Sequence, residues 1–293
     1  MKSLVAYLAF RAGMAILGIL PATVANALGV LGGLAAYPFA RGRRAMALRH
    51  ARRAGGPGAD AARACRRMFA SYGRYWAEVL WVRPHRSRQV RSRMVVEGLD
   101  HVVEAQHRGA GIILALPHVG NWEVAGLIAD EIGLELVAVA EDLPNRRIRD
   151  WFVRLRNQMH IEVVLAGGGL KVMRSLEETL RRGGAVALLS DRDLKGKGIP
   201  VTFFGEETTL PAGPALLARR TGAPILPVAS YFRPRVGHHI VVEPPLALPP
   251  DGSRASWMSE ATQGVADALE RLIRRAPEQW HLFQPNWPSD REG

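Results

Sequence analysis

Short apolar runs alternate with helical patterns along most of the chain. The run from Gly111 to Leu116 is too short for a confident helix and indicates a strand buried on both faces of a parallel sheet. Similar short runs recur at residues 94–96, 136–139, 161–165, 185–189, 225–231 and 240–242. This alternation predicts an α/β fold, a single domain with a mostly parallel central sheet flanked by helices.

A polar turn follows the strand at Gly111–Leu116. It carries His118, and a helical pattern from Trp122 to Ile132 begins directly after it. His118 therefore stands at the carboxyl end of a buried strand, where ligands of open α/β sheets bind. A hydrogen-bonded structural histidine is the alternative at such a position.

The spacing between His118 and Glu123 limits how the two side chains can meet. Five residues along an ideal helix turn through roughly 500°, so the pair cannot share a face of one helix. If the turn folds the chain back, the Glu123 carboxylate can accept the Nδ1–H of His118 and leave Nε2 as a base. Such a pair suits removal of a proton from an alcohol that attacks an activated carbonyl.

The amino-terminal segment is apolar and carries no charged residue from Ala12 to Ala40. Pro21 divides it into two helical pieces, Ser3–Leu20 and Ala22–Tyr37, which suit an interface better than a clean membrane crossing; a true span is the alternative. The arginines that follow favour the cytoplasmic side and anionic lipid; they are Arg41, Arg43, Arg44, Arg49, Arg52 and Arg53. We expect residues 1–53 to be apolar membrane-associating helices with a basic flank, and residues 54–293 to form the α/β body.

Composition narrows the classes of partner. With 293 residues, 48% hydrophobic and 23% charged, the chain can bury a substantial core, and its formal net charge of +12 implies acidic partners. Its basic residues follow an apolar segment and no nucleic-acid-binding motif is recognised, so we expect no nucleic acid partner. Cys65 is the only cysteine, and the adjacent His238 and His239 point to opposite faces of a strand, so we expect no metal site.

A second polar cluster follows the run at residues 185–189. Asp191, Arg192 and Asp193 would reach the same sheet edge as His118. Arg192 could neutralise a phosphate or a thioester oxyanion, or else form an internal ion pair with either aspartate. The stretch from Lys195 to Leu210 is expected to be a loop.

The sequence from His118 to Glu123, with Gly120-Asn121-Trp122 between, resembles the signature of the lysophospholipid acyltransferase superfamily. Within it, the sequence especially resembles the bacterial lipid A late acyltransferases and the actinobacterial phosphatidylinositol mannoside acyltransferases. Further similar stretches follow in the order of those families: Leu189–Leu194, Val201–Glu206, Leu210–Ala215, Pro224–Val228 and Trp280–Trp287. The stretches 189–194 and 201–206 look more like the mannoside branch, whereas Glu123 is the lipid A form of the dyad.

The resemblance implies an O-acyltransferase. A long-chain acyl group would pass directly from acyl-coenzyme A to a mannose hydroxyl of a phosphatidylinositol mannoside, with His118 and Glu123 as the catalytic dyad. Acyl-coenzyme A is a co-substrate, acyl carrier protein is the alternative donor, and no further cofactor is implied. The anionic glycolipid acceptor implies a membrane surface, at the cytoplasmic face of the plasma membrane. A lipid A late acyltransferase and, more distantly, a thioester hydrolase are the alternative functions.

The resemblance also implies substrate contacts. By position, Glu141 and Arg156 resemble residues that line the catalytic groove in these families, and the region around Phe203 borders the acyl-chain groove. The residues expected to bind substrate are Glu141, Arg156, Asp191, Arg192, Phe203, Phe204 and Glu206.

Overall fold

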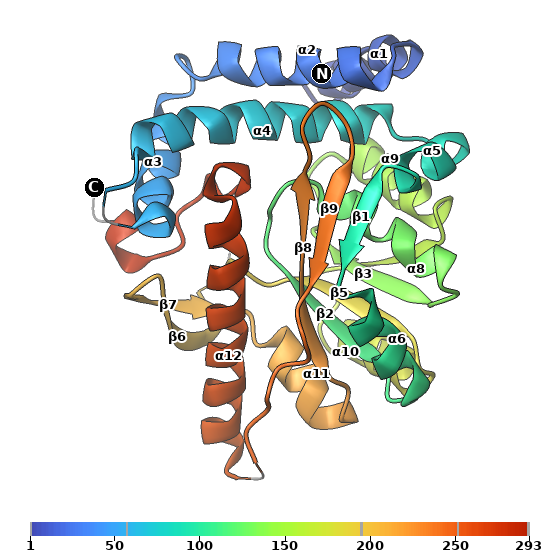
Figure 1. The fold of residues 1–293 in the computed structure, drawn as a ribbon, viewed down its shortest axis with the longest axis vertical. Coiled ribbons are helices and arrows are strands. Elements are labelled where there is room, and N and C mark those ends of the chain that lie inside the picture. Colours follow the sequence, from blue (N-terminus) through green and yellow to red (C-terminus); the bar gives the residue numbers. More distant parts are fainter. Residues whose placement is uncertain (1, 57, 194–195, 251, 292–293) are drawn as a thin grey trace.

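A central sheet organises the molecule (Figure 1). The computed structural model describes residues 2–56, 58–193, 196–250 and 252–291. Within these residues seven strands form the sheet, in the order β1-β9-β8-β2-β5-β3-β4. Their bounds are β1 (Met94–Glu97), β2 (Ile112–Leu116), β3 (Leu136–Ala140), β4 (Ile161–Leu165), β5 (Ala185–Leu189), β8 (Ile225–Phe232) and β9 (His238–Val242).

The sheet is parallel over most of its width. Strands β8, β2, β5, β3 and β4 run in one direction, while β9 pairs antiparallel with β8 and β1 pairs parallel with β9. The expected α/β fold with a mostly parallel central sheet is therefore confirmed. The carboxyl ends of β2 and β5 lie side by side, because Leu116 of β2 is in register with Leu189 of β5.

Helices cover both faces of the sheet. Ile113 and Ala115 of β2 share a buried apolar cluster with α10 (Leu170–Arg181), α11 (Gly213–Thr221) and α12 (Arg254–Arg275). Ile112 and Leu116 point to the other face, since side chains alternate along a strand. There they pack with α6 (Leu99–His107), α7 (Trp122–Ala125), α8 (Leu127–Glu131) and α9 (Arg146–Asn157).

The amino-terminal helices form a separate layer along one edge of the sheet (Figure 1). It comprises α1 (Lys2–Ile19), α2 (Ala22–Ala36), α3 (Arg41–Gly55) and α4 (Ala61–Trp81), followed by η1 (Pro84–Arg86) and α5 (Ser87–Arg91). Asp60 caps α4 by accepting a hydrogen bond from the Arg63 backbone N–H at 2.9 Å. Among the described helices none alone is long and apolar enough to cross a membrane, although α2 and α3, bent by 103°, together meet the length and composition test.

Helices α2 and α4 approach each other through glycines. A methyl group on Gly33 of α2 would overlap the backbone carbonyl of Phe69 in α4, and one on Gly73 of α4 would overlap the backbone of Gly29. The missing Cβ atoms let the two backbones come into direct contact. This seam attaches the outer helix α2 to α4.

Two expectations about local structure are wrong. The described part of the stretch 195–210 is an antiparallel hairpin and not a loop, formed by β6 (Ile199–Phe203) and β7 (Glu206–Leu210). Phe204 and Gly205 both have positive φ, as a two-residue type I′ hairpin turn requires, and a phenylalanine gives no sequence signal for that conformation. The helix expected from Trp122 to Ile132 is interrupted at Gly126, which packs closely against Ile161 and Leu136.

The glycine seam predicts opposite effects for two neighbouring substitutions. Gly33→Ala should lower the free energy of unfolding by about 1–3 kcal/mol, because the new methyl group forces α2 away from α4. Gly32→Ala should raise it by roughly 0.5–1 kcal/mol, because its Cβ meets nothing within 4 Å and alanine favours the helix. Denaturant unfolding of both variants measures the difference. Equal effects of the two substitutions would contradict close contact at this seam.

Candidate active site

His118 and Asp191 meet at the carboxyl ends of the adjacent strands β2 and β5. His118 Nδ1 lies 2.6 Å from Asp191 Oδ1, and the backbone N–H of His118 donates to Asp191 Oδ2 at 3.0 Å. A carboxylate only accepts, so Nδ1 carries the proton and Nε2 presents a lone pair. Nε2 makes no hydrogen bond within the described residues, and His118 lines a cavity. The pair therefore has the geometry of a histidine base oriented by a buried carboxylate.

The expected hydrogen bond between Glu123 and His118 is wrong. Glu123 faces α9 instead, where Arg156 donates Nε to Oε2 at 2.7 Å and Nη2 to Oε1 at 2.5 Å. Tyr75 of α4 adds a long hydrogen bond to Oε1 at 3.5 Å. A bidentate pair with a guanidinium holds a carboxylate more strongly than one imidazole N–H, which accounts for this orientation. Asp191, expected to bind substrate, occupies the position beside His118 that the sequence predicts for Glu123.

Burial and charge set the ionisation of these groups. Burial of Asp191 opposes its charge, but the charge of His118 and hydrogen bonds from His118 and Trp280 lower its pKa to about 2. Burial likewise opposes the charge of Arg156, yet Glu123 holds the pKa of this guanidinium above its usual value. Burial, followed by the charge of Glu123, raises the pKa of the Tyr75 hydroxyl well above its usual value. At neutral pH Asp191 is thus an anion and Arg156 a cation.

The carboxyl-terminal segment 279–290 holds the turn that carries His118. It begins at the last residue of η2 (Pro277–Gln279) and ends with η3 (Pro288–Asp290). His281 donates its backbone N–H to the His118 carbonyl at 2.7 Å, and Gly120 donates to the Gln279 carbonyl at 2.9 Å. Trp280 donates its indole N–H to Asp191 Oδ2 at 2.8 Å. In the sequence, this segment is recognisable only by the resemblance of Trp280–Trp287 to the acyltransferase families, and that resemblance implies no role for it.

A buried carboxylate also supports the turn from behind. Glu78 of α4 accepts hydrogen bonds at 3.0 Å from Asn121 in the turn, Asn26 in α2 and Arg74. His238 Nε2 lies 3.3 Å from the same carboxylate. Asn121 is wholly buried. The turn is therefore fixed between the carboxyl-terminal segment on one side and the amino-terminal helices on the other.

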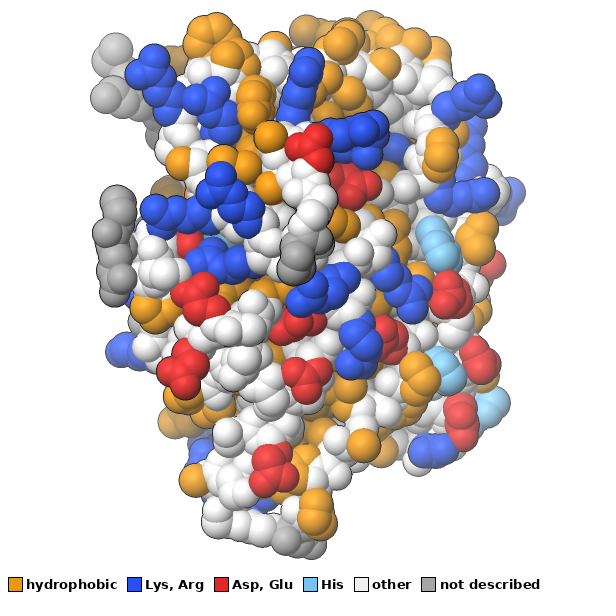
Figure 2. Space-filling view, turned by 60° about the vertical axis from the view of Figure 1, so that its left-hand side comes forward, with side chains coloured by type: hydrophobic (Ala, Val, Ile, Leu, Met, Phe, Trp, Pro, Cys, Tyr) orange, Lys and Arg blue, Asp and Glu red, His pale blue; other side chains and the backbone are white. Residues whose placement is uncertain are grey.

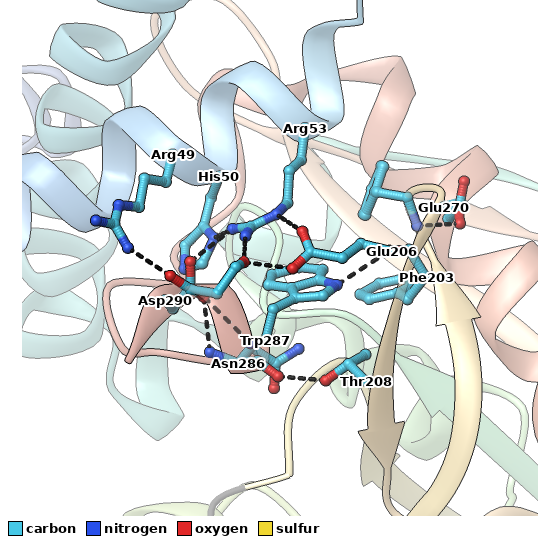
Figure 3. A network of polar contacts seen from close by, with 12 residues as sticks. Arg49, His50, Arg53, Phe203, Glu206, Thr208, Glu270, Asn286, Trp287 and Asp290 are labelled. Atoms are coloured by element: carbon cyan, nitrogen blue, oxygen red, sulfur yellow. Dashed lines mark hydrogen bonds and ion pairs between the residues drawn. The ribbon is translucent and has the colours of Figure 1, made fainter. Parts of the chain in front are cut away.

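The aromatic residues expected at a groove belong to a structural network (Figure 3). Arg53 of α3 donates to Glu206 at 2.9 Å and to Asp290 at 2.8 Å, and Trp287 donates its indole N–H to the Phe203 carbonyl at 3.1 Å. Phe203 is fully buried and stacks on Trp287. The structure therefore places Phe203, Phe204 and Glu206 outside the lining of the cavity, where they join the hairpin to the carboxyl terminus.

The cavity beside His118 has a volume of about 360 Å³, within the usual range for small-molecule sites. It runs between the sheet and the helices α6 to α9, and every strand of the central sheet contributes to its lining. Ala138 and Ala187, small side chains on central strands, leave room in its middle. His118, Trp122, Glu123 and Arg156 also line it. The cavity is thus a largely apolar groove with one polar region, which contains the imidazole, carboxylate and guanidinium groups of these residues.

Two further expected site residues lie together at this cavity. Arg192 donates to Glu141 Oε2 at 3.1 Å and to Gln284 Oε1 at 3.1 Å, and all three residues line the cavity. Asp191 faces His118, so the alternative ion pair between Arg192 and Asp191 is not formed. Arg43 of α3 lines the same cavity. Cations from separate elements therefore surround the polar part of the groove.

Comparison with known proteins gives consistent matches over the chain. A sequence model of the family described as bacterial lipid A biosynthesis acyltransferase matches residues 2–289. The chain is 37% identical to the phosphatidylinositol mannoside acyltransferase of Mycobacterium tuberculosis over 223 residues, 75% of this chain and 69% of that protein. It is 35% identical to the phosphatidylinositol mannoside acyltransferase of Mycolicibacterium smegmatis over 286 residues, 97% and 91% of the two chains. It is 27% identical to the lipid A biosynthesis palmitoleoyltransferase of Escherichia coli over 198 residues, 66% and 60% of the two chains.

The network around α3 predicts how stability depends on pH. His50 is fully buried, donates Nε2–H to the Gln284 carbonyl at 3.0 Å, and has its pKa lowered to about 4 by burial. Below pH 6.5 this residue is protonated in the unfolded chain but stays neutral in the folded protein until the pH approaches 4. The free energy of unfolding therefore decreases as the pH is lowered. His50→Gln keeps a donor without this proton uptake, and should reduce the loss of unfolding free energy between pH 8 and pH 5 by about 2 kcal/mol. Urea unfolding at both pH values measures this. An unchanged loss in the variant would show that His50 is protonated in the folded state.

Proposed function

Because the chain belongs to the bacterial lipid A biosynthesis acyltransferase family and is an acyltransferase, we propose that it acylates a mannose hydroxyl of a phosphatidylinositol mannoside with acyl-coenzyme A as the donor. The observation that carries this proposal is the His118–Asp191 pair, with Nε2 available beside an apolar cavity. The choice of acceptor rests on the higher identity to the two mannoside acyltransferases, 35–37%, than to the lipid A enzyme, 27%.

The apolar groove fits the acyl chain of the donor. Its walls are Leu, Ile, Val and Ala side chains from the sheet and from the helices above it. Burying each methylene of an acyl chain contributes about 0.8 kcal/mol, so such a groove selects long chains. The acyl chain of the donor would lie across the strands of the sheet, with the thioester group beside His118. This assignment replaces the expected groove at Phe203 and Phe204.

The reaction follows from the position of the base. Nε2 of His118 takes the proton from the acceptor hydroxyl as its oxygen attacks the thioester carbonyl. The new C–O bond forms, the C–S bond breaks, and the imidazolium returns the proton to the leaving thiolate. Asp191 keeps Nδ1 protonated and stabilises the imidazolium through the 2.6 Å contact. The alcohol is acylated directly, without an acyl-enzyme intermediate.

The arginines of the cavity suit anionic groups of the substrates. Glu123 holds Arg156 in place through two hydrogen bonds, and Glu141 with Gln284 holds Arg192. Preorganised guanidinium groups stabilise phosphate and developing oxyanions without rearrangement during the reaction. We assign them to the coenzyme or lipid phosphates and to the thioester oxyanion. Glu123 then acts on substrate binding through Arg156 and not on His118.

The amino-terminal layer suits attachment to an anionic membrane. Hydrophobic side chains gather along the upper edge of the molecule, over α1 and α2 (Figure 2). The exposed large ones are Leu4, Val5, Leu8, Ile16, Ile19, Val24, Leu28, Leu31 and Phe39. Arg41 and Arg43 are exposed directly after Phe39. Basic residues at a membrane surface contribute about 1 kcal/mol each with anionic lipid, so this face would lie on the cytoplasmic leaflet.

Acyl transfer from labelled palmitoyl-coenzyme A tests the function. Offered mono- and dimannosylated phosphatidylinositol and a lipid A precursor, the protein should label a mannoside, and His118→Ala should abolish the label.

The same assay tests the roles of the two carboxylates. Asp191→Asn should lower kcat about 10³–10⁴-fold, because the tautomer and the stabilising charge are both lost. Glu123→Gln, which keeps a hydrogen-bonding partner for Arg156, should cost far less and act mainly on KM. Equal losses of kcat in Asp191→Asn and Glu123→Gln would contradict the roles assigned to these residues. Label on the lipid A precursor alone would support the lipid A acceptor. Release of free fatty acid alone would support a hydrolase.

Vesicle sedimentation tests the membrane surface. The double variant Leu28→Glu, Leu31→Glu should bind vesicles containing phosphatidylinositol at least tenfold more weakly, because burial of each leucine contributes about 1.5–3 kcal/mol. Leu170→Glu is the matched control, since Leu170 is 72% exposed on α10, outside the amino-terminal layer. Equal binding by the double variant and the control would place the contact with lipid elsewhere.

A further inference from the structure

Within the described part of the chain the Asp191 carboxylate receives three hydrogen bonds, and one comes from outside the turn that it orients. Two of them come from His118, from Nδ1 to Oδ1 at 2.6 Å and from the backbone N–H to Oδ2 at 3.0 Å. The third comes from the Trp280 indole N–H to Oδ2 at 2.8 Å. Of these three bonds, the indole bond is the one that ties the carboxylate to the carboxyl-terminal segment. It therefore fixes the plane of the carboxylate independently of the histidine.

Trp280 is itself held rigidly. It is completely buried, and its ring contacts those of His50, Phe203, Phe204 and Trp287 at centroid distances of 5.4–6.3 Å. It does not line the cavity. Its indole N–H is thus a fixed donor that reaches Asp191 from the side away from substrate.

A second residue of the same segment fixes the backbone at Asp191. Asn286 donates its side-chain N–H to the Asp191 carbonyl at 3.2 Å and accepts from the backbone N–H of Asp193 at 3.2 Å. Both ends of the aspartate, carboxylate and carbonyl, are therefore bonded to the segment 279–290. Because Asp191 has no exposed surface, water does not substitute for a missing donor.

We propose that Trp280 is a positioning residue for acyl transfer: its indole N–H orients the Asp191 carboxylate so that His118 presents Nε2 to the acceptor hydroxyl. The proposal rests on the proposed function only in calling the His118–Asp191 pair catalytic. The orientation of the pair is a property of the protein without substrate and is measured separately below.

Removal of this N–H has a defined electrostatic direction. A carboxylate with one donor fewer carries a more localised charge and attracts the imidazolium more strongly. His118 then stays protonated to higher pH, so the acid limb of the kcat/KM profile moves upward. The misoriented carboxylate also lowers kcat, whereas KM for the donor stays near its original value because Trp280 does not contact the cavity.

Other charged and titratable groups surround the pair and stay unchanged in this comparison. His281 and His50 interact electrostatically with Asp191, and the cavity adds further groups from α3, α4, α7, α9 and the residue after β3. Those groups, with Arg192 beside the aspartate, are Arg43, Tyr72, Tyr75, Glu123, Glu141, Arg149, Arg156 and Arg192. Since the variants compared below alter none of them, a shift in the profile reports on the indole bond.

The chain contains a matched control for the indole bond. Trp287 is as completely buried as Trp280, lies in the same segment, and donates its indole N–H to the Phe203 backbone carbonyl at 3.1 Å. Trp280→Phe and Trp287→Phe remove the same atoms from equally buried positions. Only Trp280→Phe removes a hydrogen bond to the Asp191 carboxylate.

The full-length protein in detergent or vesicles is tested in two assays. In acyl transfer, Trp280→Phe should lower kcat about tenfold at unchanged donor KM and raise the acid limb by about half a pH unit, while Trp287→Phe leaves the limb in place. The second assay needs no activity: diethyl pyrocarbonate reacts with an imidazole only in its neutral form, and mass spectrometry of the His118 peptide gives the pH of half-maximal modification. This midpoint should rise by about half a pH unit in Trp280→Phe alone.

An isosteric replacement covers the case in which Trp280→Phe fails to fold. Site-specific replacement of Trp280 by 3-benzothienylalanine substitutes sulfur for the N–H and retains the shape of the ring. It should give the same upward shift in both assays. Midpoints and acid limbs identical to those of the unaltered protein and of Trp287→Phe would overturn the proposal. A shifted His118 midpoint in a protein without transferase activity would support the positioning role and refute the proposed function.

Discussion

A buried carboxylate is stable only when every part of it is compensated, and the arrangement of this protein depends on how Asp191 meets that condition. Asp191 has no exposed surface, and burial alone would raise the pKa of its carboxyl group. The interaction with His118 and the hydrogen bonds from His118 and Trp280 outweigh this effect and lower the pKa to about 2. The donors come from two places distant in sequence, the turn after β2 and the carboxyl-terminal segment. The buried carboxylate therefore remains ionised only when the turn and the carboxyl-terminal segment are both in place.

Strand register is what brings the pair together. Leu116 and Leu189 are in register on neighbouring parallel strands, and His118 and Asp191 each follow two residues later. Parallel strands present their carboxyl ends at one sheet edge, so equal offsets place the two side chains opposite each other. The apolar groove follows from the same sheet, since alternate side chains of each strand form its floor.

Much of this architecture could be predicted from the sequence, because apolar runs bounded by glycine and polar turns are strong signals for buried parallel strands. The sheet edge that carries His118 and Asp191 could be predicted for the same reason. The partner of His118 could not, since the short spacing to Glu123 suggested a local pair, while the actual pair depends on which strands are neighbours. The equal offsets of His118 and Asp191 from their strands were the available signal, and strand order was needed to use it. The hairpin at Phe204 escaped prediction because its turn places phenylalanine in a conformation that the residue rarely adopts.

The Glu78 carboxylate connects the outer helix α2 to the turn that carries His118. Asn26 of α2 and Asn121 of the turn donate to the same buried group, each at 3.0 Å. Detaching α2 from α4 would take a donor from that carboxylate and weaken its hold on the turn; by thermodynamic reciprocity, a well-formed turn strengthens the attachment of α2. The outer helix α2 and the turn that carries His118 are therefore energetically linked across α4. A ligand that orders the turn would therefore strengthen the attachment of α2 to α4. Attachment of α2 would stabilise the ordered turn by the same free energy.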